Sequence, residues 1–247
     1  MVLEIRPSFS EGLKYLETLF DLFHLTLTGT ESELYAPSNQ EEIRLAIDQT
    51  HVSFSETGRI TAKHQSLYDE KLISLTHQIS ALEIKINQQE NELGQLKQEE
   101  GKKQVESAKL VMKNIFSFRK GINKEFVAKI LAIKERVKEI VDRHNSMVAS
   151  ISDLKSNLTS SRLELNRLRD ESSFIGSLGS KIRSITTFLA MLQGKVHVMF
   201  NTQQWRYEFE PLLLSIDDLI TFLQSRENLM TSLADKHIVE KIKSKYF

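Results

Sequence analysis

The 247-residue sequence contains no cysteine and only three prolines. Without thiols the chain forms no disulfide, no thiolate metal site and no cysteine nucleophile. Its prolines are Pro7, Pro37 and Pro211, so the span from Ser38 to Glu210 contains none. Proline in a helix interior removes a backbone hydrogen bond and clashes with the preceding turn. Such a long proline-free span therefore favours very long helices.

The chain also lacks an excess of either charge and a long apolar run. Thirty-three basic residues balance thirty-three acidic ones, which argues against nucleic acid as a partner. The longest uncharged run, Ser184–Gly194, has eleven residues, whereas a membrane-spanning helix needs about 20. Glu4 and Pro7 interrupt the amino terminus where a signal peptide would build its apolar region. We expect a soluble chain without a cleavable signal peptide.

Two apolar seams with alternating spacings of three and four residues lie within the proline-free span. This heptad spacing is typical of long helices packed along partner helices. The first seam is Leu72, Leu75, Ile79, Leu82, Ile86, Gln89, Leu93 and Leu96. The second is Ile130, Ile133, Val137, Ile140, His144, Met147, Ile151, Leu154, Leu158, Ser161, Leu165 and Leu168. The predicted fold is all-α, an elongated bundle built on a long antiparallel coiled-coil hairpin.

Local signals predict where these helices begin. Ser8 with Glu11, and Ser38 with Glu41, have the spacing of a capping box. They predict a first helix of about five turns after Ser8 and a second helix from Ser38. Pro211 is placed in the first turn of a final helix.

Glycines suggest where the chain bends. We place the hairpin turn at Gly121, with Asn123 as the next N-cap, in preference to Gly101. Gly176 and Gly179 lie in a patch of small residues, which predicts either a kink or the close approach of another helix. We expect a single elongated domain. Residues 1–37 form a helix and loop, residues 38–172 form the hairpin with its tip near 110–126, and residues 173–247 form kinked helices that pack on the base.

No catalytic, cofactor-binding or metal-binding motif is found, and we expect no enzyme activity. The seven histidines are scattered, and His144 occupies a seam position, where a neutral hydrogen-bonded side chain or a register device is favoured over a ligand. Trp205 fits a partly buried anchor between helices. Asp217 and Asp218 are adjacent on a helix, so they point in different directions and form no acid–base pair.

The predicted tip combines apolar bulk with positive charge. Between Leu110 and Val127 the apolar residues alternate with lysine and arginine, and the only acid is Glu125. An end that is both apolar and cationic suits an anionic lipid surface. The alternative is that these aromatic residues close the end of the bundle as core. The candidate membrane-contacting residues are Ile115, Phe116, Phe118, Arg119, Lys120, Ile122, Lys124 and Phe126.

Three features of the sequence together point to a known family. They are the proline-free pair of long helices, the segment from Phe174 to Phe200 and the run from Trp205 to Leu214. The sequence resembles the α-helical pore-forming toxins related to cytolysin A, and among them the B-type subunit of the alpha-xenorhabdolysin binary cytotoxins. The resemblance implies a cytotoxin component that is released from the cell, assembles with a second helical subunit and inserts a hairpin tip into the target membrane. The tip lacks the long uncharged tongue of many relatives, so insertion is expected to need the partner. The alternative is a coiled-coil scaffold or adaptor without membrane activity.

Overall fold

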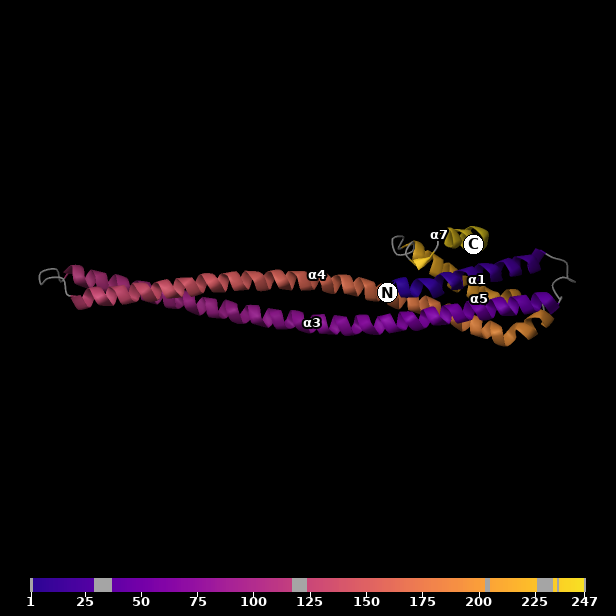
Figure 1. Cartoon of the computed structure of the whole chain (residues 1–247), viewed down its shortest axis with the longest axis horizontal. Helices are drawn as coiled ribbons and strands as arrows, with labels where there is room; N and C mark the ends of the chain where they lie inside the picture. Colours follow the sequence, from indigo (N-terminus) through magenta and orange to yellow (C-terminus); the bar gives the residue numbers. More distant parts are fainter. Residues whose placement is uncertain are drawn as a thin grey trace. The chain divides into compact units, whose positions relative to one another are not determined.

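The computed structural model describes residues 2–28, 37–116, 124–202, 205–225, 233–234 and 236–246. Its helices are α1 (Val2–Thr28), α3 (Pro37–Phe116), α4 (Lys124–Thr202), α5 (Trp205–Gln224) and α7 (Lys236–Tyr246) (Figure 1). No strand is found in these ranges. The predicted all-α fold is confirmed. The chain divides into two compact units, which we call the base unit (Met1–Glu70 with Arg169–Phe247) and the hairpin unit (Lys71–Leu168).

The base unit holds a large apolar core to which all five helices contribute. The apolar positions of α1 recur every three or four residues, so one face of the helix is buried. Gly12 lies on this helix against Phe54 of α3, and a Cβ at residue 12 would be 3.2 Å from the Phe54 ring. The buried core includes Ile5, Phe9, Leu13, Leu16, Ile47, Phe54, Leu178, Ile182, Ile185, Leu212, Ile216, Leu219, Val239 and Ile242.

The hairpin unit consists of residues 71–116 of α3 and 124–168 of α4, which lie side by side (Figure 1). Arg162 Nη2 is 2.6 Å from Glu83 Oε1, and Lys155 Nζ is 2.7 Å from Glu90 Oε1. From Glu83 to Glu90 the residue number rises along α3, while the number of the paired residue on α4 falls from 162 to 155. The two helices are therefore antiparallel.

Both predicted seams face inward in the hairpin unit. All eight positions of the first seam and all twelve of the second are buried or half-buried. Leu75, Ile79 and Leu165 form a small buried cluster. His144 is half-buried at its seam position. The seam prediction is therefore confirmed residue by residue.

Two predicted helix starts are wrong. Helix α1 begins at Val2, with Pro7 inside it, and Ser8 is not its cap because the Ser8 hydroxyl donates to the Ile5 carbonyl one turn back. Helix α5 begins at Trp205 and continues through Pro211. In both cases an apolar residue upstream of the predicted start, Ile5 or Phe209, packs into the core. The burial of these side chains favours continuing the helix backwards past the proline.

The glycines of α3 and α4 leave both helices continuous. Gly101 lies within α3, which excludes it as the turn, while the preferred turn at Gly121 falls outside the described residues. Gly176 and Gly179 lie within α4, where a Cβ would be 3.3 Å from Gln65 Oε1 and 3.2 Å from Thr61 Oγ1, respectively. Of the two alternatives for this patch, the structure shows the close approach of helices.

Candidate functional site

The predicted tip lies at the loop end of the hairpin unit, where α3 ends and α4 begins. Ile115 and Phe116 are the last residues of α3, and Lys124 and Phe126 lie in the first turn of α4. Because the two helices are antiparallel, these halves of the tip lie at the same end of the unit (Figure 1). Phe118, Arg119, Lys120 and Ile122 belong to the connection between the helices. The side chains of all eight predicted tip residues lie outside the described residues.

The described turns next to this end carry exposed apolar side chains. On α3, Val105 is 54% exposed and Met112 is 58% exposed, and on α4 Leu131 is 59% exposed. Val111 and Val127 are also exposed. If this end were closed as a bundle core, its large apolar residues would turn inward, as the seam residues do. Among the described neighbours of the tip, these five apolar side chains face solvent, whereas Leu110 and Ile130 are half-buried.

A shallow groove of about 720 Å³ runs along α3 beside these exposed residues. Among the described residues, Lys102, Lys109 and Lys113 line it together with one acid, Glu106. The Glu106 carboxylate already accepts a hydrogen bond of 2.8 Å from Lys103. The groove is therefore cationic at its rim and apolar at Val105, an arrangement that suits an anionic and amphipathic surface. Lys102, Val105 and Leu131 were not among the predicted tip residues, because they lie more than one turn outside it.

The described residues contain no helix that is both long and apolar enough to cross a membrane. In the described part of α3 and α4 near the tip, charged residues interrupt the apolar positions every few residues. The exposed apolar surface at the loop end thus belongs to amphipathic helices.

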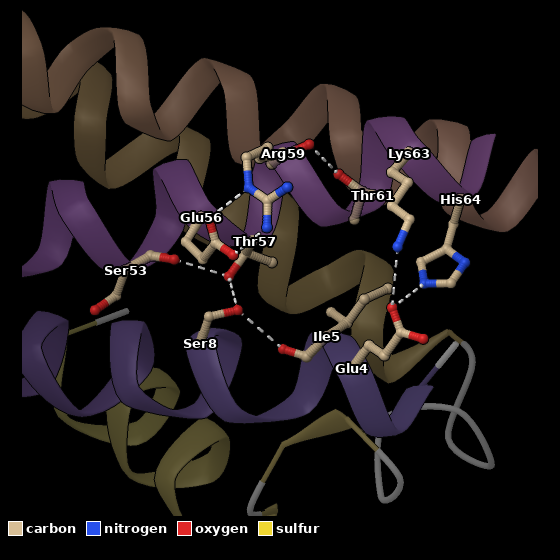
Figure 2. A network of polar contacts seen from close by, with 11 residues as sticks. Glu4, Ile5, Ser8, Ser53, Glu56, Thr57, Arg59, Thr61, Lys63 and His64 are labelled. Carbon is tan, nitrogen blue, oxygen red and sulfur yellow. Dashed lines mark hydrogen bonds and ion pairs between the residues drawn. The ribbon is translucent and has the colours of Figure 1, made fainter. Parts of the chain in front are cut away.

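A second cluster of polar side chains joins α1 to α3 in the base unit (Figure 2). His64 is buried, and its Nε2 lies 3.2 Å from Glu4 Oε2, with Lys63 Nζ 4.0 Å from the same oxygen. One turn or more away, the Thr57 hydroxyl lies 2.9 Å from Ser8 Oγ and 2.9 Å from the Ser53 carbonyl oxygen. These contacts link two helices across their interface.

The polar cluster has the geometry of a structural contact. The Ser8 hydroxyl donates to the Ile5 carbonyl, and His64 faces Glu4, so no serine hydroxyl is aligned with an imidazole base (Figure 2). Nearby, the hydrogen bond from Arg59 lowers the pKa of the exposed Glu56 carboxyl, as in an ordinary surface ion pair. No group of three or more potential metal ligands occurs among the residues that the structure describes.

Comparison with known proteins gives one informative likeness. No protein-family model and no curated protein sequence matches the chain. Among solved structures, the chain is similar to the soluble triple head mutant of AhlC, from the tripartite alpha-pore forming toxin AHL of Aeromonas hydrophila. The TM-score is 0.67 at 13% sequence identity, and the match covers 89% of this chain and 81% of that chain. At this identity the match establishes a shared fold across most of both chains.

Proposed function

We propose that this chain is one component of a multi-subunit α-helical pore-forming toxin. The observation that carries the proposal is the fold likeness to AhlC, a component of a tripartite toxin, over 89% of the chain. The exposed apolar and cationic residues at the loop end of the hairpin unit support it, because that end is where a helical hairpin would first meet a lipid bilayer.

The proposed mechanism begins with attraction to the membrane surface. Lysines near the loop end, including Lys102 and Lys109, contact anionic headgroups through Coulomb attraction. The aromatic residues Phe116 and Phe118 then enter the apolar region, with Arg119, Lys120 and Lys124 remaining at the headgroup level. Ile115, Ile122 and Phe126 complete the inserting surface.

A second helical subunit completes the membrane-inserted state. An amphipathic hairpin in a bilayer must cover its polar side with protein or with a water-filled lumen, and the described helices contain no fully apolar span. We therefore propose that a partner subunit covers these amphipathic helices. From the resemblance of the sequence to the B-type subunit of the alpha-xenorhabdolysin binary cytotoxins, we assign the chain that role in a binary toxin. The chain is proposed to be released from the producing cell before it acts on a target membrane.

Dye release from vesicles tests this function. Vesicles of phosphatidylcholine and phosphatidylglycerol loaded with a self-quenched dye are exposed to this chain, to a candidate helical partner subunit, and to both together. We expect release only with both subunits. Complete release by this chain alone would reject the two-subunit mechanism. Failure to release dye, together with failure to bind the vesicles under every pairing, would favour the scaffold alternative.

A further inference from the structure

The outward side of α3 in the hairpin unit carries no charge over seven turns. In a two-helix coiled coil, the positions that point away from the partner are usually the most charged, because they stay in water. Although 27% of the whole chain is charged, none of the twelve outward positions between residues 73 and 98 is charged, and all twelve are exposed. They are Ile73, Ser74, His77, Ser80, Ala81, Ile84, Asn87, Gln88, Asn91, Gly94, Gln95 and Gln98. We call this surface the amide face, after its five Asn and Gln residues.

The outward side of α4 has a matching surface. Its ten outward positions between residues 145 and 166 are all exposed and include one charged residue, Asp153. They are Asn145, Ser146, Ala149, Ser152, Asp153, Ser156, Thr159, Ser160, Leu163 and Asn166. We call this surface the hydroxyl face, after its five Ser and Thr residues.

The charged residues of this region are placed along the edges of the seam. Glu83 and Glu90 lie beside the seam on α3, and they pair with Arg162 and Lys155 beside the seam on α4. These ion pairs hold the hairpin together. Solubility alone gives no reason to confine every charge of residues 73–98 to the seam edges. The outward faces therefore meet a separate requirement, which is satisfied by side chains that are all uncharged on α3 and uncharged except for Asp153 on α4.

We propose that the amide face of one copy packs against the hydroxyl face of a second copy of this chain. Covering a charged side chain without a partner costs several kcal/mol, so the charge-free amide face favours a neighbour with few charges, and the hydroxyl face carries one, Asp153. Asn and Gln amides offer both donors and acceptors, and Ser and Thr hydroxyls do the same. The small residues Ser80, Ala81 and Gly94 on one face, and Ala149 and Ser152 on the other, allow two helices to approach closely.

The levels of the two faces also match. The contacts of Glu83 with Arg162 and of Glu90 with Lys155 show that residues 73–98 of α3 and residues 145–166 of α4 lie at the same level along the hairpin. Within one hairpin the amide face and the hydroxyl face point in opposite directions. Copies standing parallel and in register therefore bring the two kinds of face together. Such a contact joins different surfaces on the two copies, so it repeats from copy to copy and closes a ring when the rotation allows.

The contact is weak in dilute solution. A helix face of 26 residues is about 39 Å long and about 10 Å wide, which is roughly 400 Å² on each copy. Stable complexes bury about 800 Å² per partner. The proposal thus predicts a chain that is monomeric when dilute and that associates side by side when its copies are concentrated.

Disulfide trapping tests the contact in a chain that has no native cysteine. The single variants Asn91→Cys and Ser152→Cys, which lie at the same level on the two faces, are mixed under mild oxidation. At about 0.1 mM protein, a contact with a Kd of about 1 mM is populated to about a tenth, and each trapped dimer is retained. The control pair is Gln78→Cys with Asn157→Cys, at exposed uncharged positions beside the seam.

We expect mixed dimers of the Asn91→Cys and Ser152→Cys variants to be about tenfold more abundant than random collision would give. A tenfold excess corresponds to a free-energy preference of about 1.4 kcal/mol for the mixed contact. The control pair should stay at the random proportion. Adding Asn87→Glu to the Asn91→Cys variant should abolish the excess, whereas Gln78→Glu in the same variant should preserve it. An excess of dimers between identical variants, or random proportions for every pair, would overturn the proposal. The experiment uses neither membrane nor partner subunit, so its result is independent of the proposed pore-forming function.

Discussion

Phe116 and Phe118 distinguish a membrane-contacting tip from a closed bundle end. Their described neighbours Met112 and Leu131 are 58% and 59% exposed, which favours the membrane interpretation. We predict that replacing both phenylalanines by serine abolishes dye release in the presence of the partner. Because the rings face solvent in the free protein under this interpretation, the free energy of unfolding should change by less than about 1 kcal/mol. Urea denaturation measures that change.

The matched control for the phenylalanine variants is Val52→Ser with Leu214→Ser, two residues of the base unit that are 66% and 65% exposed. These substitutions also remove exposed apolar surface, but far along the sequence from the tip, so dye release should persist. Buried aromatic rings lose about 3 kcal/mol or more each on truncation. A destabilisation of that size in the Phe116 and Phe118 variant would identify the rings as core.

Lys120 and Lys124 test the electrostatic part of the mechanism. Replacing both with glutamate should weaken binding to anionic vesicles by roughly 1 kcal/mol for each charge removed, with a further loss from repulsion. The effect should shrink as salt rises, because screening shortens the range of exposed charges. Vesicle sedimentation across a salt series measures it. The control is Lys71→Glu with Lys85→Glu, which changes the net charge equally at exposed positions of α3. An equal loss of vesicle binding in the two double variants would contradict the assignment of the tip.

Gly12 lies where helix α1 packs closely against Phe54 of α3, so the space for a side chain at this position is small. A methyl group at residue 12 would lie 3.2 Å from the fully buried Phe54 ring, which also packs edge-on against Phe9 at a centroid distance of 6.0 Å. In Gly194→Ala the new methyl meets no atom within 4 Å, so the gain in helix propensity should raise stability by up to about 1 kcal/mol. In Gly12→Ala the crowding should cancel or exceed that gain. Thermal unfolding of the two variants decides, and equal stabilisation would show that the Phe54 ring can move aside.

Helices α3 and α4 are the elements that the sequence predicts best, because their signal is repeated many times. One misplaced residue in a seam is outweighed by the others, so polar seam residues such as Gln89, His144 and Ser161 did not obscure the pattern. Their half-buried positions follow from the periodicity of the rest. The antiparallel pairing followed from two seams joined by a short connection.

Replacing apolar residues of α4 by alanine should distinguish seam positions from surface positions by the stability that each replacement costs. Ile140 is 5% exposed and Leu131 is 59% exposed on the same helix. We predict that Ile140→Ala costs about 2–4 kcal/mol of stability in the hairpin unit, whereas Leu131→Ala costs less than about 1 kcal/mol. Hydrogen exchange of amides in residues 127–168 reports the loss locally. Similar costs at the two positions would contradict the assigned seam.

Helix starts were predicted less well because a capping pattern involves only a few residues. Ser8 and Glu11 have the spacing of a cap, yet the chain before them is already helical because Ile5 packs into the core. Phe209 has the same effect before Pro211, since the centroid of its ring lies 3.8 Å from the centroid of the Phe23 ring. These contacts join residues distant in sequence, so local spacing could not reveal them.

The whole chain combines a base unit with a broad core and a hairpin unit with a thin one. The base unit buries apolar residues from α1, α5 and α7, whereas the hairpin unit relies on its seam and on edge ion pairs such as Glu83 with Arg162. Sequence alone located the apolar and cationic segment near residues 110–126, but whether its neighbours face inward depends on the phase of each helix. The exposure of Val105, Val111 and Met112 required the structure.

Membrane entry of the tip is the central claim, and a fluorescent probe at the tip tests it most directly. Because the chain has no cysteine, Ser117→Cys can be labelled alone with an environment-sensitive dye, and Ser55→Cys in α3 of the base unit provides an exposed control position. Both are mixed with the partner subunit and with vesicles containing brominated lipids. We predict a blue shift and bromine quenching at residue 117 and neither at residue 55. A probe at residue 117 that stays in water while the vesicles release their dye would contradict the account.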